Sequence, residues 1–259
     1  MATYESAADA IAQPAVGMTQ MQNAAARMWV PFMILGFILV VAAFVIGVIV
    51  AQVTADYFSF SKDVREAAGA GSDIVDKRVF IESTTAWLPE FKFLGIGMIL
   101  AGITFLLATI LGNLRESGST VQQALGVTVV VPKPPLVAMA FPLLMMLGMM
   151  VLIAALILGI VQAVIAADYW DHSIANQLNP APAGSDLLSD LGTVQAIDRW
   201  LNPFKFVGIA LLLSGIGLAL ATIIWTLRFQ SRRLLDILAG RPSVRWPVPN
   251  TTFSSGAER

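Results

Sequence analysis

Four runs of residues without a charged side chain constrain the fold of this chain more than any motif. They cover residues 28–55, 93–114, 134–167 and 206–227. The shortest run has 22 residues, which as a helix is about 33 Å long and spans the ~30 Å hydrocarbon core of a bilayer. Backbone groups in lipid must be paired internally, and the runs lack the polar and apolar alternation of barrel strands. The sequence therefore predicts an all-α integral membrane protein with four transmembrane helices.

The composition agrees with a membrane protein and excludes several kinds of site. Hydrophobic residues make up 57% and charged residues 13% of the chain, whereas soluble domains have about 25% charged residues. The chain has no cysteine, so disulfides, iron–sulfur clusters and thiolate metal sites are excluded. We expect the lipid bilayer and other integral membrane subunits as partners, and no nucleic acid.

The sequence contains an internal repeat. Residues 87–115 and 200–228 are identical at more than half of their positions, at an offset of 113. Residues 31–57 match 143–169 at an offset of 112, and both copies end in Ala-Asp-Tyr. Each copy contains two of the apolar runs, so both copies enter the membrane from the same side. The chain is therefore predicted to consist of two helical hairpins in a parallel repeat, related by an axis along the membrane normal.

The repeat divides the chain into segments. Each hairpin is expected to contain two transmembrane helices and an extracytoplasmic segment of about 30 residues, by the spacing of the two runs. The predicted segments are an N-terminal tail at 1–27, a first hairpin at 28–115 with helices about 29–55 and 92–114 around segment 56–91, a loop at 116–136, a second hairpin at 137–228 with helices about 138–166 and 205–227 around segment 167–204, and a basic tail at 229–259. In the second extracytoplasmic segment, Ser185 is the predicted N-cap of a short amphipathic helix.

The distribution of basic residues predicts the orientation in the membrane. Arg228, Arg232 and Arg233 follow the fourth run closely, where arginine and lysine favour the cytoplasmic side. The first apolar run is preceded by a polar segment carrying Glu5 and Asp9, so a cleavable signal peptide of the usual form is not expected. We therefore expect a multi-pass protein of the plasma (inner) membrane with both termini in the cytoplasm.

Paired charges at the outer ends of the runs are the sharpest candidate for chemistry. Asp56 and Lys92 in the first hairpin, and Asp168 and Lys205 in the second, stand at the ends of adjacent runs. A carboxylate and an ammonium group there could form a structural ion pair at the membrane interface. Ionisable groups in membranes also serve as proton or ion relays. We favour the structural ion pair because end positions cost little free energy.

Two further sets of residues have interfacial or packing patterns. Tyr57, Trp87, Tyr169 and Trp200 stand at the predicted interfaces, where aromatic belts form. Small residues recur in the second helix of each hairpin, at spacings that allow close helix contact. The residues predicted to pack against another helix are Gly95, Gly97, Gly102, Gly208, Ser214 and Gly215.

Other candidates for ligand binding are weaker. His172 is the single histidine and lies near Asp168 and Asp171, which together contain metal-ligand types. Methionines cluster in the third run at Met139, Met145, Met146, Met149 and Met150, and thioethers can hold copper(I). We interpret the histidine as a polar loop residue and the methionines as apolar packing. No catalytic residue, metal or cofactor is predicted.

The absence of a ligand set and of charges central to the runs favours a non-catalytic subunit that scaffolds or stabilises a larger membrane complex. Two other functions stay open. One is a small channel or carrier with its path at the repeat interface. The other is an accessory subunit of a membrane redox or copper-dependent oxidase or monooxygenase assembly. We do not expect an enzyme.

Overall fold

The computed structural model describes residues 16–124, 137–173, 176 and 185–239, without the side chains of 16–22 and 137–139. The described chain is all-helical. Its elements are α2 (Val16–Ser59), α3 (Lys62–Glu66), α4 (Asp73–Ala124), α5 (Val137–Trp170) and α7 (Asp186–Leu238). The prediction of four long apolar helices is confirmed, because α2, α4, α5 and α7 are each long and apolar enough to cross a membrane.

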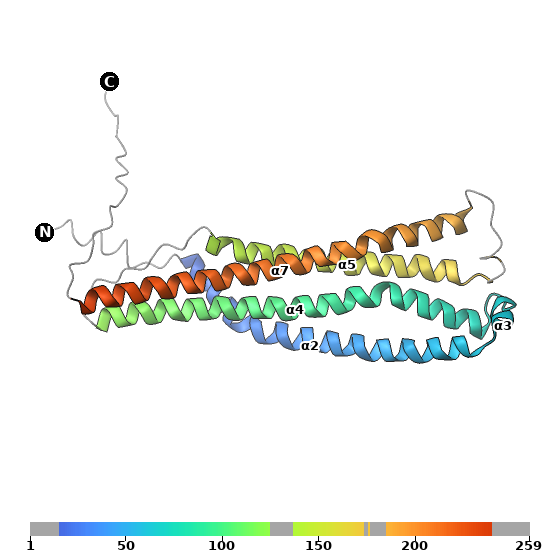
Figure 1. Cartoon of the computed structure of the whole chain (residues 1–259), viewed down its shortest axis with the longest axis horizontal. Coiled ribbons are helices and arrows are strands. Elements are labelled where there is room, and N and C mark those ends of the chain that lie inside the picture. Colours follow the sequence, from blue (N-terminus) through green and yellow to red (C-terminus); the bar gives the residue numbers. More distant parts are fainter. Residues whose placement is uncertain (1–15, 125–136, 174–175, 177–184, 240–259) are drawn as a thin grey trace, which may run out of the picture.

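α4 is the central helix of an elongated bundle. It packs against α2, α5 and α7, and α5 also packs against α7. Figure 1 shows α2 along one edge of the bundle, with α5 and α7 on the other side of α4. α2 with α4 forms the first hairpin, and α5 with α7 forms the second. We call the end of the bundle beside α3 the α3 end.

α4 and α7 begin far before the helix starts expected near residues 92 and 205. They are 52 and 53 residues long, or about 78 and 80 Å at the rise of an α-helix. The Ser185 N-cap is confirmed, because its side chain accepts a hydrogen bond from the Leu188 N–H, but the helix that it caps is the 53-residue α7 and not a short one. Pro89 and Pro203 lie inside the helices, which continue even though each proline removes one backbone hydrogen bond. Much of each expected extracytoplasmic segment is therefore an extension of a helix that is long and apolar enough to cross a membrane.

Small residues bring the two helices of each hairpin into close contact. A Cβ atom at Gly36 of α2 would lie 2.7 Å from the Gly95 carbonyl oxygen of α4. In the second hairpin, a Cβ atom at Gly148 of α5 would lie 2.8 Å from the Gly208 carbonyl oxygen of α7. Backbones can approach this closely only where the side chain is a hydrogen atom. The two hairpins thus share the same tight crossing.

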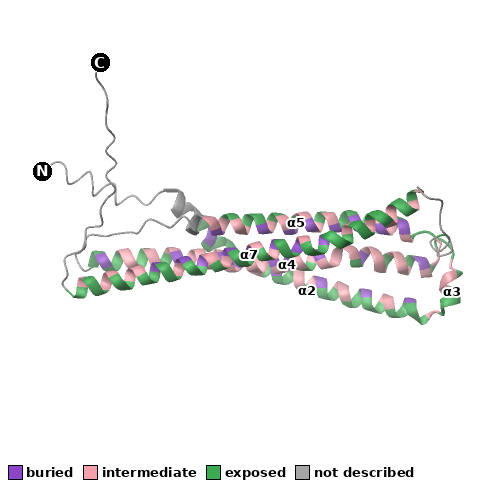
Figure 2. Cartoon of the chain, turned by 45° about the horizontal axis from the view of Figure 1, so that its top comes forward, coloured by how far each residue is buried: buried purple, intermediate pink, exposed green. Residues whose placement is uncertain are grey.

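The outer faces of α2 and α5 are apolar. Phe44 of α2 is 71% exposed and Val164 of α5 is 67% exposed. Figure 2 shows exposed residues along the outside of the long helices, with buried residues in the strips where helices meet. Because the exposed side chains on α2 and α5 are large and apolar, these faces suit contact with lipid or with another membrane helix.

Candidate functional site at the interface of the two hairpins

A buried ion pair joins the two hairpins. Lys205 of α7 donates a hydrogen bond from Nζ to Oε1 of Glu90 in α4, at 3.0 Å. Their side chains are only 8% and 3% exposed. Charged groups so deeply buried are rare unless they are paired. This pair is therefore the strongest candidate for a functional site among the described residues.

The surroundings of the pair are shaped to hold it. Nζ of Lys205 lies 5.2 Å from the ring centroid of Phe93, within the range of a cation–π interaction. Phe93 also packs edge-to-face against Phe206 of α7. On the α5 side, a Cβ atom at Gly159 would lie 3.2 Å from Cγ of Glu90. The absence of a side chain at Gly159 thus makes room for the glutamate.

Glu90 uses only part of its hydrogen-bonding capacity. Its second oxygen, Oε2, is buried and has no hydrogen-bond partner within the described parts of the chain. A carboxylate can accept several hydrogen bonds, and a buried oxygen without one is costly in free energy. The site is therefore one donor short of full satisfaction.

The expected partners of Asp56 and Lys205 are corrected by the structure. Asp56 pairs with Lys77 at 3.1 Å, and Lys205 pairs with Glu90. Lys92 and Asp168 are exposed, and neither belongs to an ion pair among the described residues. The reason is the early start of α4, which continues as a helix from residue 73. Lys92 is 15 residues beyond Lys77 in that helix, so the two lysines are about 22 Å apart along its axis.

The depth of the pair depends on which helices are used to measure it. Glu90 is 13 residues beyond Lys77, or about 20 Å inward from the level of Asp56. Gly159, beside Glu90, is nine residues before Asp168, or about 13 Å inward from the end of the α5 run. Both values lie close to half of a ~30 Å hydrocarbon core. Relative to the α2 run the pair is central, whereas it lies about a quarter of the way along the longer α5 run from its outer end and at the edge of the runs of α4 and α7.

The four predicted interfacial aromatic residues have different environments. Tyr57 and Tyr169 are buried, at 6% and 5% exposure. The Arg65 guanidinium lies over the Tyr57 ring. Trp87 is half-buried and packs edge-to-face on Phe91, whereas Trp200 is 43% exposed. The two tyrosines are therefore not part of an exposed aromatic belt, because the packing of neighbouring helix ends buries them.

The predicted packing residues divide among three interfaces. Gly95 and Gly102 of α4 face α2, whereas Gly97 faces Leu152 of α5. Gly208 and Gly215 of α7 face α5, where a Cβ atom at Gly215 would lie 3.3 Å from the Phe141 carbonyl oxygen. Ser214 differs from the others because it is exposed.

The described structure places several of the weaker ligand candidates. Nδ1 of His172 lies 3.0 Å from the Asp168 carbonyl oxygen, and Met146 and Met150 are each 62% exposed. The side chain of Met139 lies outside the described residues. No group of three or more histidine, aspartate or glutamate side chains that could hold a metal ion occurs among the residues described.

The pair of Glu90 and Lys205 was missed by sequence reasoning. The signal was present: the second copy of Trp-Leu-Pro-Glu-Phe-Lys-Phe reads Trp-Leu-Asn-Pro-Phe-Lys-Phe, so Glu90 is an acid without a repeat counterpart. An unmatched charge beside an apolar run indicates a role particular to one copy. Comparisons with family models, curated proteins and solved structures found no match for this chain.

Proposed function

We propose that this chain is a non-catalytic subunit of a larger membrane complex, which scaffolds or stabilises neighbouring membrane proteins. In this proposal the two hairpins are a parallel duplication, the protein lies in the plasma (inner) membrane, and both termini are cytoplasmic. The shared tight crossing at Gly36 and Gly148 supports the duplication.

The observation that carries the proposal is an offset between apolar belts in both hairpins. In the first, the outer limit of the α2 run is level with Lys77, whereas the α4 run begins 15 residues later, after Lys92. In the second, Gln162 contacts the Val194 carbonyl oxygen. If Gln162 and Val194 are at the same height along the bundle, Asp168 lies 6 residues to one side of that height and Lys205 lies 11 residues to the other side, a separation of 17 residues. The offsets correspond to about 22 and 25 Å.

A lipid bilayer alone cannot surround the apolar runs of α2 and α5 and those of α4 and α7 at the same time. If the membrane follows α2 and α5, the exposed side chains of Lys92, Asp198 and Arg199 stand at hydrocarbon depth. If it follows α4 and α7, exposed apolar residues such as Ile49 and Val164 stand in water. Packed helices are 8–10 Å apart, so a tilt of 40° shifts their levels by only about 6 Å. Another protein that covers the mismatched faces would remove the conflict.

The repeat supports a docking position for such a partner. Four residues of α4 that contact α5 have counterparts in α7 at the offset of 113, and all four counterparts are exposed. The α4 residues are Ala86, Trp87, Glu90 and Gly97, and the α7 counterparts are Arg199, Trp200, Pro203 and Ala210. We call these four counterparts the open α7 face. In the proposal it receives a helix of the partner, as α4 receives α5.

The test is assembly in native membranes. Ala210→Trp places a large ring on the open α7 face, and Phe37→Trp is a matched control on exposed α2 at a similar depth. After mild detergent extraction, native electrophoresis and mass spectrometry should show a defined complex for the wild type and Phe37→Trp. Ala210→Trp should lose its partner, because close helix contact does not tolerate added bulk. A wild-type chain that runs as a lone monomer with independent activity would contradict the proposal.

A small channel or carrier is the second candidate, because the buried pair lies where the two hairpins meet. Such a protein would carry an ion or solute past Glu90 and Lys205. Purified protein in liposomes decides between the two functions. Flux that Glu90→Gln and Lys205→Met abolish, and that Lys92→Met on the exposed repeat counterpart leaves intact, would replace the scaffold proposal. We expect no flux above that of empty liposomes.

A further inference from the structure

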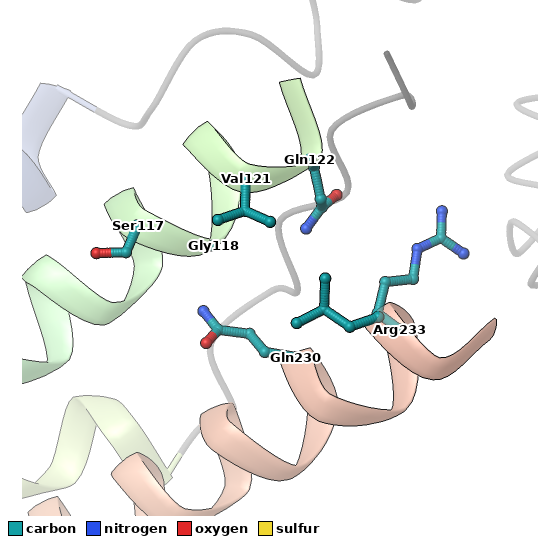
Figure 3. Close-up of a pocket in the computed structure, with 7 residues that line it drawn as sticks. Ser117, Gly118, Val121, Gln122, Gln230 and Arg233 are labelled. Carbon is teal, nitrogen blue, oxygen red and sulfur yellow. The ribbon is translucent and has the colours of Figure 1, made fainter. Parts of the chain in front are cut away.

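The ends of α4 and α7 opposite the α3 end form a pocket. Figure 1 shows both helices continuing past the start of α5 at this end. The pocket has a volume of about 130 Å³ and is lined by Ser117, Gly118, Val121 and Gln122 of α4 and by Gln230 and Arg233 of α7. Figure 3 shows that the lining side chains come from two facing helices, α4 and α7, with a space between the helices. The Glu90–Lys205 pair is not part of this pocket.

A glutamine fixes the base of the pocket. Nε2 of Gln230 donates a hydrogen bond to the Leu114 carbonyl oxygen at 2.7 Å. Gly118 allows this approach, because a Cβ atom there would collide with the same amide nitrogen. The two helices are thus held together just beyond the apolar runs that end at Leu114 and Leu227.

Two arginines at this end of α4 and α7, one in the pocket lining and one beside it in sequence, have unused hydrogen-bond donors. Arg233 lines the pocket, and its Nε is buried without a partner in the described chain. Arg115 lies one turn toward the apolar run on the same face as Gly118 and Gln122, by helical spacing. Its Nε and Nη2 are likewise buried without a partner within the described residues. Buried donors without an acceptor are costly in free energy, and an anion would satisfy them with charge-assisted hydrogen bonds.

The charges near the pocket favour an anion. Arg115, Arg228, Arg232 and Arg233 lie within this end of α4 and α7. The acidic residues there are Glu116 and Asp236, and both are exposed. None of the ion pairs among the residues that the structure describes includes any of these arginines. The cations are therefore available to an external ligand.

We infer that this pocket binds the phosphate group of an anionic phospholipid. Ser117 and Gln230 are each three residues beyond an apolar run, or about 4.5 Å from its end, which is the depth of lipid headgroups. Basic pockets between transmembrane helices hold such headgroups. Val121 and Leu234 give the pocket an apolar side, which suits the glycerol and acyl part of a lipid. A free phosphate ion shares the anionic group but lacks that part.

The experiment uses the full-length protein, purified in detergent and mixed with phosphatidylglycerol or phosphatidylcholine. Native mass spectrometry counts the lipids that stay bound, and thermal unfolding measures protection. We expect one retained phosphatidylglycerol, bound about tenfold more tightly than phosphatidylcholine. Inorganic phosphate at the same concentration should protect less. Equal protection by inorganic phosphate, or equal retention of both lipids, would overturn the inference.

Three variants separate a built pocket from general surface charge. Arg115→Gln with Arg233→Gln should weaken phosphatidylglycerol binding about tenfold, because it removes both unpaired guanidinium groups. Val121→Trp fills the pocket from a position that is 44% exposed, and should weaken binding similarly without changing the charge. Arg232→Gln removes an exposed cation outside the lining and should weaken binding much less than the loss of Arg115 and Arg233. An equal loss with Arg232→Gln, or no loss with Val121→Trp, would refute the pocket; circular dichroism checks that each variant is folded.

Discussion

The Glu90 carboxylate connects α4 to α7 through Lys205, although both groups lie in an apolar surrounding. Two opposite charges at 3.0 Å offset part of the free energy that their removal from water costs. Loss of one partner leaves the other charge buried alone. Lys92, the repeat counterpart of Lys205, is exposed and carries no such risk. Lysines at matching positions of the two repeats are therefore expected to contribute differently to the free energy of unfolding.

Removal of either member of the pair should destabilise the protein more than removal of both. We expect Glu90→Gln or Lys205→Met to lower the free energy of unfolding by about 3–5 kcal/mol, because a single buried charge stays behind. The double variant should be less destabilised than either single one. Denaturant titrations in mixed micelles, followed by circular dichroism, measure these differences. Lys92→Met serves as the control and should change stability by less than about 0.5 kcal/mol; additive losses in the double variant would argue against direct coupling of the pair.

At the scale of the helices, glycine positions set how closely neighbouring elements pack. Gly36 and Gly148 allow backbone contact within each hairpin, and Gly97 and Gly159 allow α5 to seat against α4. Gly217 differs because nothing lies within 4 Å of where its Cβ would be. A glycine at helical spacing therefore does not by itself identify a contact.

Gly148→Leu should open the crossing between α5 and α7. The new side chain would meet the Gly208 carbonyl oxygen, and such overpacking costs about 1–3 kcal/mol or more. Gly36→Leu should have a similar effect in the first hairpin. Thermal unfolding in detergent provides the measurement, with Gly217→Leu as the control in open space. Equal midpoints for Gly148→Leu and Gly217→Leu would show that the crossing does not limit stability.

At the scale of the whole molecule, the four long helices follow from the charge-free runs alone. The early starts of α4 and α7 do not, because the polar residues before Lys92 and Lys205 indicate where a chain leaves lipid and not where its helix begins. The ion pair could not be placed either. Its partners are 115 residues apart, and their contact depends on how one hairpin lies beside the other, which local pattern does not encode. The repeat even suggested equal roles for Lys92 and Lys205.

The unbroken course of α4 has a mechanical consequence. One helix of 52 residues contains both Lys77, which pairs with Asp56 near the α3 end, and Gln122, which lines the pocket at the opposite end. No loop interrupts its length of about 78 Å, so a displacement at one end is passed along the helix except for what bending at Pro89 absorbs. A pivot of 5° about one end moves the other end by about 7 Å at that length. A displacement that a neighbouring protein causes beside Lys77 would therefore also move the pocket in which the lipid phosphate is proposed to bind.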